Sequence, residues 1–270
     1  MSNTTILDRA ARLDVEKMPG HWLLGSLGKR VLRPGGMELT RQLVAQLRVT
    51  PQDDVIEFAP GLGATARLVL AQQPRSYIGI EREPMVERRL AARFTGLNTR
   101  FRCASAESTG LPSCSATVLY CEAMISMQTP EQKTRILAEA FRLLQPGGRF
   151  GVHELALVPD DIGDADRKAI ERELSLNIHV GVRPATAVEW RSLLRDAGFQ
   201  LQWQVNGQMR LLEPKRIIRD EGVGGALRVG FNLLRRPAAR RRVAAMRGVF
   251  HRYAVHLGAV TMVCTKSAAA

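Results

Sequence analysis

The stretch 55–66 constrains this chain more than any other part of its sequence. A short apolar run, Val55 to Phe58, is followed by a turn rich in proline and glycine and then by residues that favour a helix. That order predicts a buried strand, a tight loop and the start of a helix. Gly61 and Gly63 have no Cβ, so the loop backbone can come close to a ligand beside the free N–H groups of the new helix.

Two acidic residues indicate which ligand the loop would hold. The glycine pattern of 61–66 also fits loops that cradle the pyrophosphate of a dinucleotide. Glu57, however, stands just before the loop, where its charge would repel a pyrophosphate and attract an amino group. A second apolar run, 77–80, ends at Glu81, which can accept hydrogen bonds from both hydroxyls of a ribose. The two acids predict a ligand with a ribose, a cationic tail and no phosphate.

At these residues the chain resembles the class I (Rossmann-like) S-adenosylmethionine-dependent methyltransferases of the small-molecule type. Their first motif is E/D-x-G-x-G-x-G, and residues 57–63 match it with Ala59 in place of the first glycine. Residues 143–150 resemble the family's Leu-x-Pro-Gly-Gly turn, and residues 189–199 resemble its last helix. The resemblance covers residues 28–155 well and implies S-adenosyl-L-methionine as the cofactor.

The resemblance also implies which residues hold that cofactor. Arg33 and Gly35 belong to an Arg-Pro-Gly-Gly segment that folds over the cofactor in similar enzymes. Ser105 stands where the family usually has an aspartate for the adenine amino group, and Glu107 could substitute for it. Glu122 follows the fourth strand. The expected cofactor-binding residues are Glu57, Ala59, Pro60, Gly61, Gly63, Glu81, Arg82, Ser105, Ala106, Glu107, Glu122, Arg33 and Gly35.

Strands alternate with helices along the chain, which predicts a doubly wound α/β fold. We expect a seven-stranded, mostly parallel sheet with helices on both faces, and the resemblance adds an antiparallel last strand and helical cap insertions. Ligands bind outside the carboxyl ends of such strands, where Glu57, Glu81, Ser105 and Glu122 fall. The expected strands are 54–58, 76–81, 100–104, 115–121, 149–155, 200–205 and 259–264.

We expect four parts along the chain. A helix is predicted over Thr5–Met18, and two helices broken near Pro237 are predicted in the basic insertion. The parts are an N-terminal helical cap segment (1–36), the cofactor-binding core (37–205, with a cap insertion at 156–186), a basic helical insertion (206–257), and the final strand and tail (258–270).

A catalytic base is expected only if the acceptor is a hydroxyl or a carbon acid. His179 lies in the 156–186 connection, which covers the substrate in related enzymes, and it is the candidate because histidine can take up a proton near neutral pH. The alternative is that His179 only hydrogen-bonds a loop. No metal is expected, since the acidic run 160–164 lacks the other ligands of a calcium loop and the four cysteines lie far apart.

The net charge of +13 comes mostly from one segment. From Gly222 to the end there are eight arginines, one lysine and no acidic residue. We expect a cap over a small-molecule substrate with a solvated basic face, and peripheral membrane contact through 222–257 is an alternative. Nucleic-acid binding is not favoured, because there is one clustered basic patch and no set of aromatic residues for base stacking beyond Phe250 and Tyr253. The oligomeric state is not indicated.

The predicted function is methyl transfer from S-adenosyl-L-methionine to a small-molecule acceptor that is hydrophobic or anionic. The alternatives are an RNA methyltransferase that uses the basic segment, a nicotinamide-dependent oxidoreductase, and a binding-only relic of the fold. No run reaches the ~18 apolar residues that span a bilayer. Residues 1–17 contain no signal-peptide core. We therefore expect a cytoplasmic enzyme.

Overall fold

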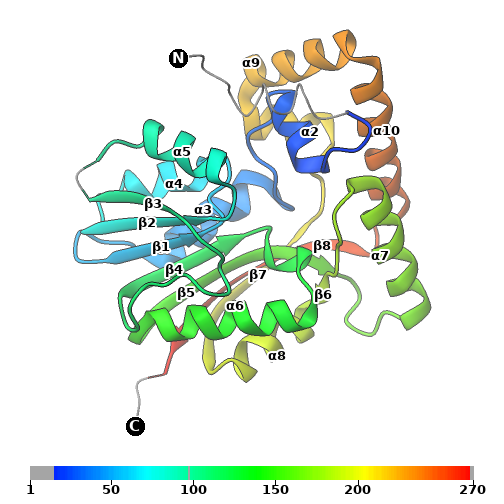
Figure 1. Ribbon diagram of the computed structural model, residues 1–270. Coiled ribbons are helices and arrows are strands. Elements are labelled where there is room, and N and C mark those ends of the chain that lie inside the picture. Colours follow the sequence, from blue (N-terminus) through cyan, green and yellow to red (C-terminus); the bar gives the residue numbers. More distant parts are fainter. Residues whose placement is uncertain (1–14, 97, 268–270) are drawn as a thin grey trace.

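The computed structural model describes residues 15–96 and 98–267. Within these residues, strands form one continuous sheet in the order β3-β2-β1-β4-β5-β8-β7, and a short strand, β6, pairs with β5 outside this order (Figure 1). The prediction of a doubly wound sheet is confirmed. The strands are β1 (Asp54–Phe58), β2 (Ser76–Glu81), β3 (Thr99–Cys103), β4 (Ala116–Glu122), β5 (Leu144–Leu157), β6 (Ala185–Thr186), β7 (Phe199–Gln208) and β8 (Leu257–Lys266).

Strands β1 to β5 are parallel, and β8 is antiparallel to its neighbours β5 and β7, as expected. Strand β5 is longer than the predicted 149–155, because extended backbone begins at Leu144, directly after the preceding helix ends. The register against β4 then shifts, since Ala116 pairs with Leu144 but Val118 pairs with Arg149. The extra residues form an irregular bulge whose Gly147 has φ 75°, a conformation that favours glycine.

Helices cover both faces of the sheet (Figure 1). One face carries α3 (Gly36–Leu47), α4 (Ala64–Leu70) and α5 (Pro84–Arg93), and the other carries α6 (Pro130–Leu143) and α8 (Ala187–Asp196). Local signals explain their starts: Pro84 occupies the first turn of α5, and Thr129 and Thr186 form capping boxes for α6 and α8.

Strand β1 divides its side chains between these two layers. Ile56 and Phe58 pack in the cluster that contains α6 and α8, whereas Val55 packs in the cluster that contains α3 and α4. Side chains alternate along a strand, so Glu57 shares the face of Val55. The acid of the first motif is therefore placed under α3 and α4.

A second helical layer stands beside the carboxyl ends of the strands (Figure 1). Its apolar core joins Leu23, Leu174 and Met246 to Leu157 at the end of β5. The expected break at Pro237 is confirmed, and Gly222 (φ 73°) adds a kink inside α9. The helices are α2 (Gly20–Ser26), α7 (Asp164–Ile178), α9 (Pro214–Arg235) and α10 (Pro237–Arg252).

The helix predicted over Thr5–Met18 falls largely on residues 1–14, which lie outside the described residues, and 15–18 form a turn and a bend. In the part of the chain that the structure describes, no helix is both long and apolar enough to cross a membrane.

Candidate functional site

The loop after β1 holds three residues in the left-handed region: Ala59 (φ 52°), Gly61 (φ 55°) and Gly63 (φ 71°). The N–H of Ala59 donates to the Ile80 carbonyl at 2.8 Å, which ties the loop to the end of β2. A Cβ on Gly61 would have only the Ala59 carbonyl near it, at 3.8 Å, but a Cβ on Gly63 would lie 2.6 Å from the Phe94 ring. Gly61 therefore leaves the loop open to a ligand, and Gly63 serves the packing of α5.

Glu81 lies beside this open part of the loop. Its Oε2 accepts a hydrogen bond from the N–H of Gly61 at 3.3 Å, and its Oε1 accepts one from the N–H of Glu83 at 3.1 Å. The side chain is 8% exposed, and burial raises its pKa despite these bonds. The acid at the end of β2 and the glycine loop, which are far apart in sequence, thus form one site.

Glu57 is buried and held by two tyrosines that sequence reasoning missed. The hydroxyls of Tyr77 and Tyr120 both donate to its Oε2, the latter at 2.7 Å. Burial raises the pKa of Glu57 to about 7, and the two tyrosine hydrogen bonds offset only part of that rise. Sequence reasoning could have found the two tyrosines from the predicted sheet, because Tyr77 in β2 and Tyr120 in β4 lie on either side of the strand that carries Glu57.

Glu122, at the end of β4, is the centre of a second buried cluster. Its Oε1 accepts hydrogen bonds from Thr40 at 2.6 Å and from His153 Nδ1 at 2.8 Å. Its Oε2 accepts from Arg33 and Thr65. Four donors fill the acceptor positions of this carboxylate. Burial would raise its pKa, but the charge of Arg33 and the bond to His153 outweigh burial and hold the pKa at about 2.

His153, in β5, is hydrogen-bonded through both of its ring nitrogens. Its Nε2 lies 2.5 Å from the Pro34 carbonyl, which can only accept, and its Nδ1 faces the ionised Glu122. The two ring nitrogens thus link the Glu122 carboxylate to the backbone of the segment that carries Arg33. The His153 ring is completely buried and serves to hold these two segments together.

The adenine candidates after β3 differ in what they contact. The Glu107 carboxylate binds Arg135 at 2.6 Å and Gln132 at 3.2 Å, both on α6. Among the described residues, the Ser105 hydroxyl accepts the N–H of Glu107, at 3.2 Å, and donates to none, so its second lone pair and its proton remain for a ligand. Ala106 packs against the core beneath. The geometry favours Ser105 over Glu107 as the polar contact.

The remaining loop candidates have structural partners. A Cβ on Gly35 (φ 71°) would lie 2.3 Å from Leu39 in α3, so the segment that carries Arg33 packs tightly against that helix. Pro60 limits the space above Gly79, and Arg82 is exposed just after β2. The segment before α3 reaches the loop after β1 through Arg33, which donates to Thr65 in the first turn of α4.

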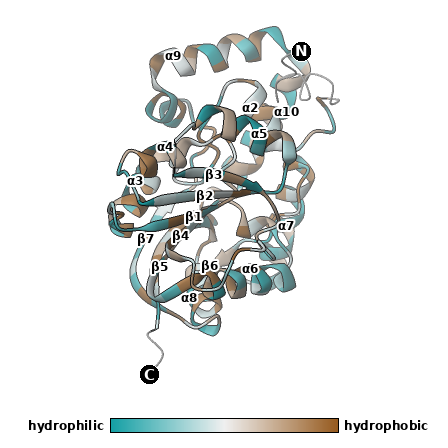
Figure 2. Ribbon diagram, turned by 60° about the vertical axis from the view of Figure 1, so that its left-hand side comes forward, coloured by the Kyte–Doolittle hydropathy of each residue, from teal (hydrophilic) through white to brown (hydrophobic). Residues whose placement is uncertain are grey.

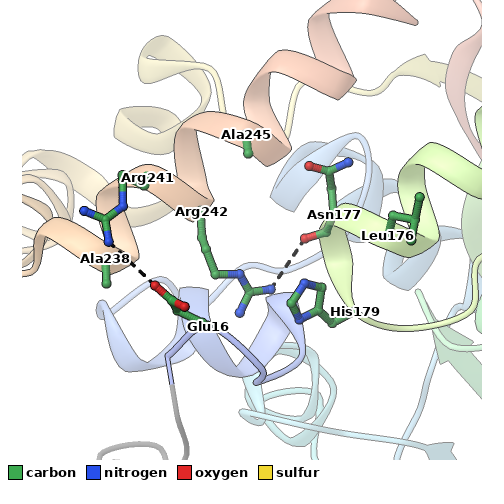
Figure 3. Close-up of a pocket in the computed structure, with 8 residues that line it drawn as sticks. All are labelled: Glu16, Leu176, Asn177, His179, Ala238, Arg241, Arg242 and Ala245. Carbon is green, nitrogen blue, oxygen red and sulfur yellow. Dashed lines mark hydrogen bonds and ion pairs between the residues drawn. The ribbon is translucent and has the colours of Figure 1, made fainter.

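His179 lies elsewhere. It is exposed, takes a left-handed conformation (φ 57°) at the end of α7 and lines a surface hollow between α7 and α10 (Figure 3). The structure does not bring it together with Glu57, Glu81 or Glu122. The hollow is lined by Glu16, Leu176, Asn177, His179, Ala238, Arg241, Arg242 and Ala245. A catalytic role for His179 stays a prediction.

The gathered residues fit a ligand with a ribose and an amino-acid tail. Glu81 offers acceptors beside the open face of Gly61, and Arg33 places a guanidinium group at the Glu122 carboxylate. Such a set can accept hydrogen bonds from hydroxyl groups at Glu81 and donate them to a carboxylate from Arg33.

Comparisons with known proteins agree with this geometry. Residues 55–148 match the family described as a methyltransferase domain. An uncharacterized protein of Haemophilus influenzae is 31% identical over 221 residues, which cover 80% of this chain and 86% of that protein.

Two solved structures share the fold. The cyclase SpnF has a TM-score of 0.69 at 18% identity, with 98% of each chain covered. Phosphoethanolamine N-methyltransferase 2 of Haemonchus contortus, solved with phosphomonomethylethanolamine and S-adenosylhomocysteine, has a TM-score of 0.68 at 11% identity, with 97% of this chain and 60% of that chain covered. Because the same fold carries a cyclase and a methyltransferase, the reaction has to be argued from the site.

Proposed function

Because this chain belongs to the class I S-adenosylmethionine-dependent methyltransferases, we propose that it methylates a small molecule that is hydrophobic or anionic, with S-adenosyl-L-methionine as the donor. The observation that carries the proposal is the contact between the Glu81 carboxylate and the N–H of Gly61. It puts a ribose acceptor and an unobstructed loop backbone at one place.

The residues around the loop would bind and orient the donor. Glu81 would accept the ribose hydroxyls, the Ser105 hydroxyl would face the adenine, and Arg33 would neutralise the carboxylate of the amino-acid tail. Glu57, held by its two tyrosines, would sit near the tail amino group. The donor, when bound, supplies an electrophilic methyl carbon. The protein then needs mainly to align the acceptor and exclude water.

The helical layer supports a small acceptor. Its apolar core includes Met127, just after β4, and Leu155 in β5, so it closes against the strand ends that carry Glu122 and Glu154. The Glu154 carboxylate accepts the N–H groups of Met124, Ile125 and Ser126, which fixes the loop after β4 beneath that layer. A helical layer packed against these strand ends would favour a small acceptor over a polymer.

A thermal-shift titration tests the donor. S-adenosylhomocysteine at a hundred times its Kd should stabilise the wild-type protein by about 2.7 kcal/mol, and NAD should give no shift. Glu81→Ala should lose most of the shift, whereas Glu87→Ala, which removes a carboxylate on α5 away from the loop, should keep it. Stabilisation by NAD alone would support the oxidoreductase instead.

Labelling tests the acceptor. A metabolite extract and total RNA, each incubated with the protein and methyl-labelled donor, should give label in the small-molecule fraction only. The arginine cluster that could favour RNA is partly occupied: Arg242 donates to the carbonyls of Val15 at 2.7 Å and Met18 at 2.6 Å, and Arg241 pairs with Glu16 at 3.6 Å. Label in RNA would overturn the small-molecule proposal.

A further inference from the structure

Helix α9 carries a row of exposed apolar side chains that no part of the proposed function uses. Val223, Leu227, Phe231 and Leu234 are between 56% and 70% exposed. Because an α-helix has 3.6 residues per turn, these four positions lie within an arc of about 80°. Figure 2 shows α9 at the top of the molecule, well away from the sheet. We call these four residues the outer stripe.

The opposite side of α9 is firmly attached to the protein. Val229 is buried there, and the Asn232 amide donates to the Leu27 carbonyl at 3.0 Å. Nearer the start of the helix, the buried Glu221 carboxylate accepts the N–H groups of Arg30 at 2.7 Å and Val31 at 2.8 Å. The helix is therefore held in one orientation, and its apolar row faces outward as part of the folded structure.

Arginines lie beside the outer stripe. Arg228 and Arg235 are exposed on the same helix, and the Arg235 guanidinium lies 5.2 Å from the centre of the Phe231 ring. Between Gly222 and Arg252, which include all of α10, there are eight arginines and no acidic residue. An apolar row flanked by arginines is the arrangement of a helix that lies in the interface of an anionic bilayer.

Charge argues against two other occupants of this face. A second copy would bring the exposed Arg228 and Arg235 of one chain close to those of the other, and the resulting repulsion opposes self-association. An RNA partner would use the arginines but would leave three exposed aliphatic side chains in contact with polar phosphate groups. An anionic lipid surface can bind both features, because the apolar row inserts into the acyl region and the guanidinium groups bind the headgroups.

We propose that the outer stripe of α9, with Arg228 and Arg235 beside it, is a docking site for the surface of an anionic phospholipid bilayer. The protein lies on the membrane without crossing it. Docking does not depend on the methyl-transfer proposal. It would place the enzyme at the membrane surface.

Vesicle flotation tests the docking site with the full-length protein. Vesicles of phosphatidylcholine mixed with phosphatidylglycerol should retain the wild-type protein, and vesicles of phosphatidylcholine alone should retain much less. Leu227→Asn combined with Phe231→Asn should weaken retention by at least about tenfold, because the apolar contact is lost. The matched controls are Leu176→Asn and Val255→Asn, which replace side chains that are 63% and 75% exposed outside the outer stripe and should leave retention unchanged.

The arginines are tested separately. Arg228→Gln and Arg235→Gln should each weaken retention by about fivefold at low salt, since each cation contributes near an anionic surface. Arg228→Lys with Arg235→Lys should restore it, which separates charge from packing. Each variant is also titrated with S-adenosylhomocysteine, and an unchanged thermal shift shows that the fold and the cofactor site are intact.

Several results would overturn the proposal. One is equal retention by anionic and neutral vesicles, or none by either. Another is an outer-stripe variant that behaves like the Leu176 and Val255 controls. A wild-type dimer that Leu227→Asn dissociates would assign the face to a second copy, and salt-sensitive RNA binding without vesicle binding would assign it to RNA.

Discussion

At the scale of single residues, the loop after β1 shows how a small departure from a motif is accommodated. Ala59 stands where similar enzymes have glycine, and its backbone is left-handed, with φ 52°. An L-residue in this region costs about 1–2 kcal/mol, because its Cβ comes close to the following carbonyl oxygen. The position therefore favours glycine because of backbone conformation, in addition to the room that a methyl group takes.

Substitutions at Ala59 should follow this conformational cost. Ala59→Gly should leave the free energy of unfolding unchanged or raise it by about 0.5 kcal/mol, since relief of strain exceeds the entropy that glycine loses on folding. Ala59→Val should lower it by more than about 1 kcal/mol, because a β-branched residue fits this region worst. Urea denaturation measures both variants. If the valine variant were as stable as the glycine variant, the backbone conformation at position 59 would not carry this cost.

At the scale of elements, α9 is joined to the segment before α3 by buried charges. Glu221 lies 3.9 Å from Lys29 Nζ, and both side chains are completely buried. Asp220, the preceding residue, accepts the N–H of Met37 at 3.0 Å in the first turn of α3. The basic helical insertion thereby holds the segment that carries Arg33, although the two are nearly 190 residues apart in sequence.

Removing one partner of this buried pair should be costly. Glu221→Gln should lower the free energy of unfolding by about 3 kcal/mol, because the buried Lys29 ammonium loses the carboxylate that it pairs with. Lys29→Met combined with Glu221→Gln should recover part of the loss. Glu213→Gln, at the exposed start of the same helix, should change stability by less than about 0.5 kcal/mol. An additive double variant in urea denaturation would show that the pair is not coupled.

At the scale of the whole molecule, two buried acids make stability depend on pH in opposite directions. The pKa of Glu57 is raised from 4.5 to about 7, so its contribution to stability is complete below pH 4.5 and is lost as the pH rises through 7. The pKa of Glu122 is lowered from 4.5 to about 2, so its contribution is complete above pH 4.5 and is lost as the pH falls through 2. Together the two carboxyl groups favour a maximum in the free energy of unfolding near pH 4.5.

The effect of Glu57 can be isolated by comparing the stability of the wild-type protein with that of Glu57→Gln at each pH. Wild-type protein should lose on the order of 3 kcal/mol of stability between pH 4.5 and 8 relative to Glu57→Gln, which cannot ionise. Urea denaturation of both proteins at a series of pH values measures it, without cofactor present. A pH-independent difference would mean that Glu57 is ionised in the folded protein across this range.

Part of the cofactor site could be predicted from short stretches of sequence, and part could not. The Gly61 loop, the acid at Glu81 and the strands of the core follow from short patterns, because strand alternation and turn chemistry act over a few residues. The partners of Glu57 and Glu122 were not predicted. They come from neighbouring strands and from α3 and α4, and their pairing depends on sheet order and register. His179, chosen for its loop position, lies in a separate hollow (Figure 3).

The sequence by itself determined the alternation of strands and helices, the glycine loop and the family, since each depends on local periodicity and on motifs of fixed spacing. Only the tertiary structure decided which charges are buried together and which side of α9 faces solvent. Those outcomes arise from contacts between distant segments, such as Glu221 with residues 29–31. Whether an acidic or apolar side chain is buried depends on what the fold places over it, and no local pattern contains that information.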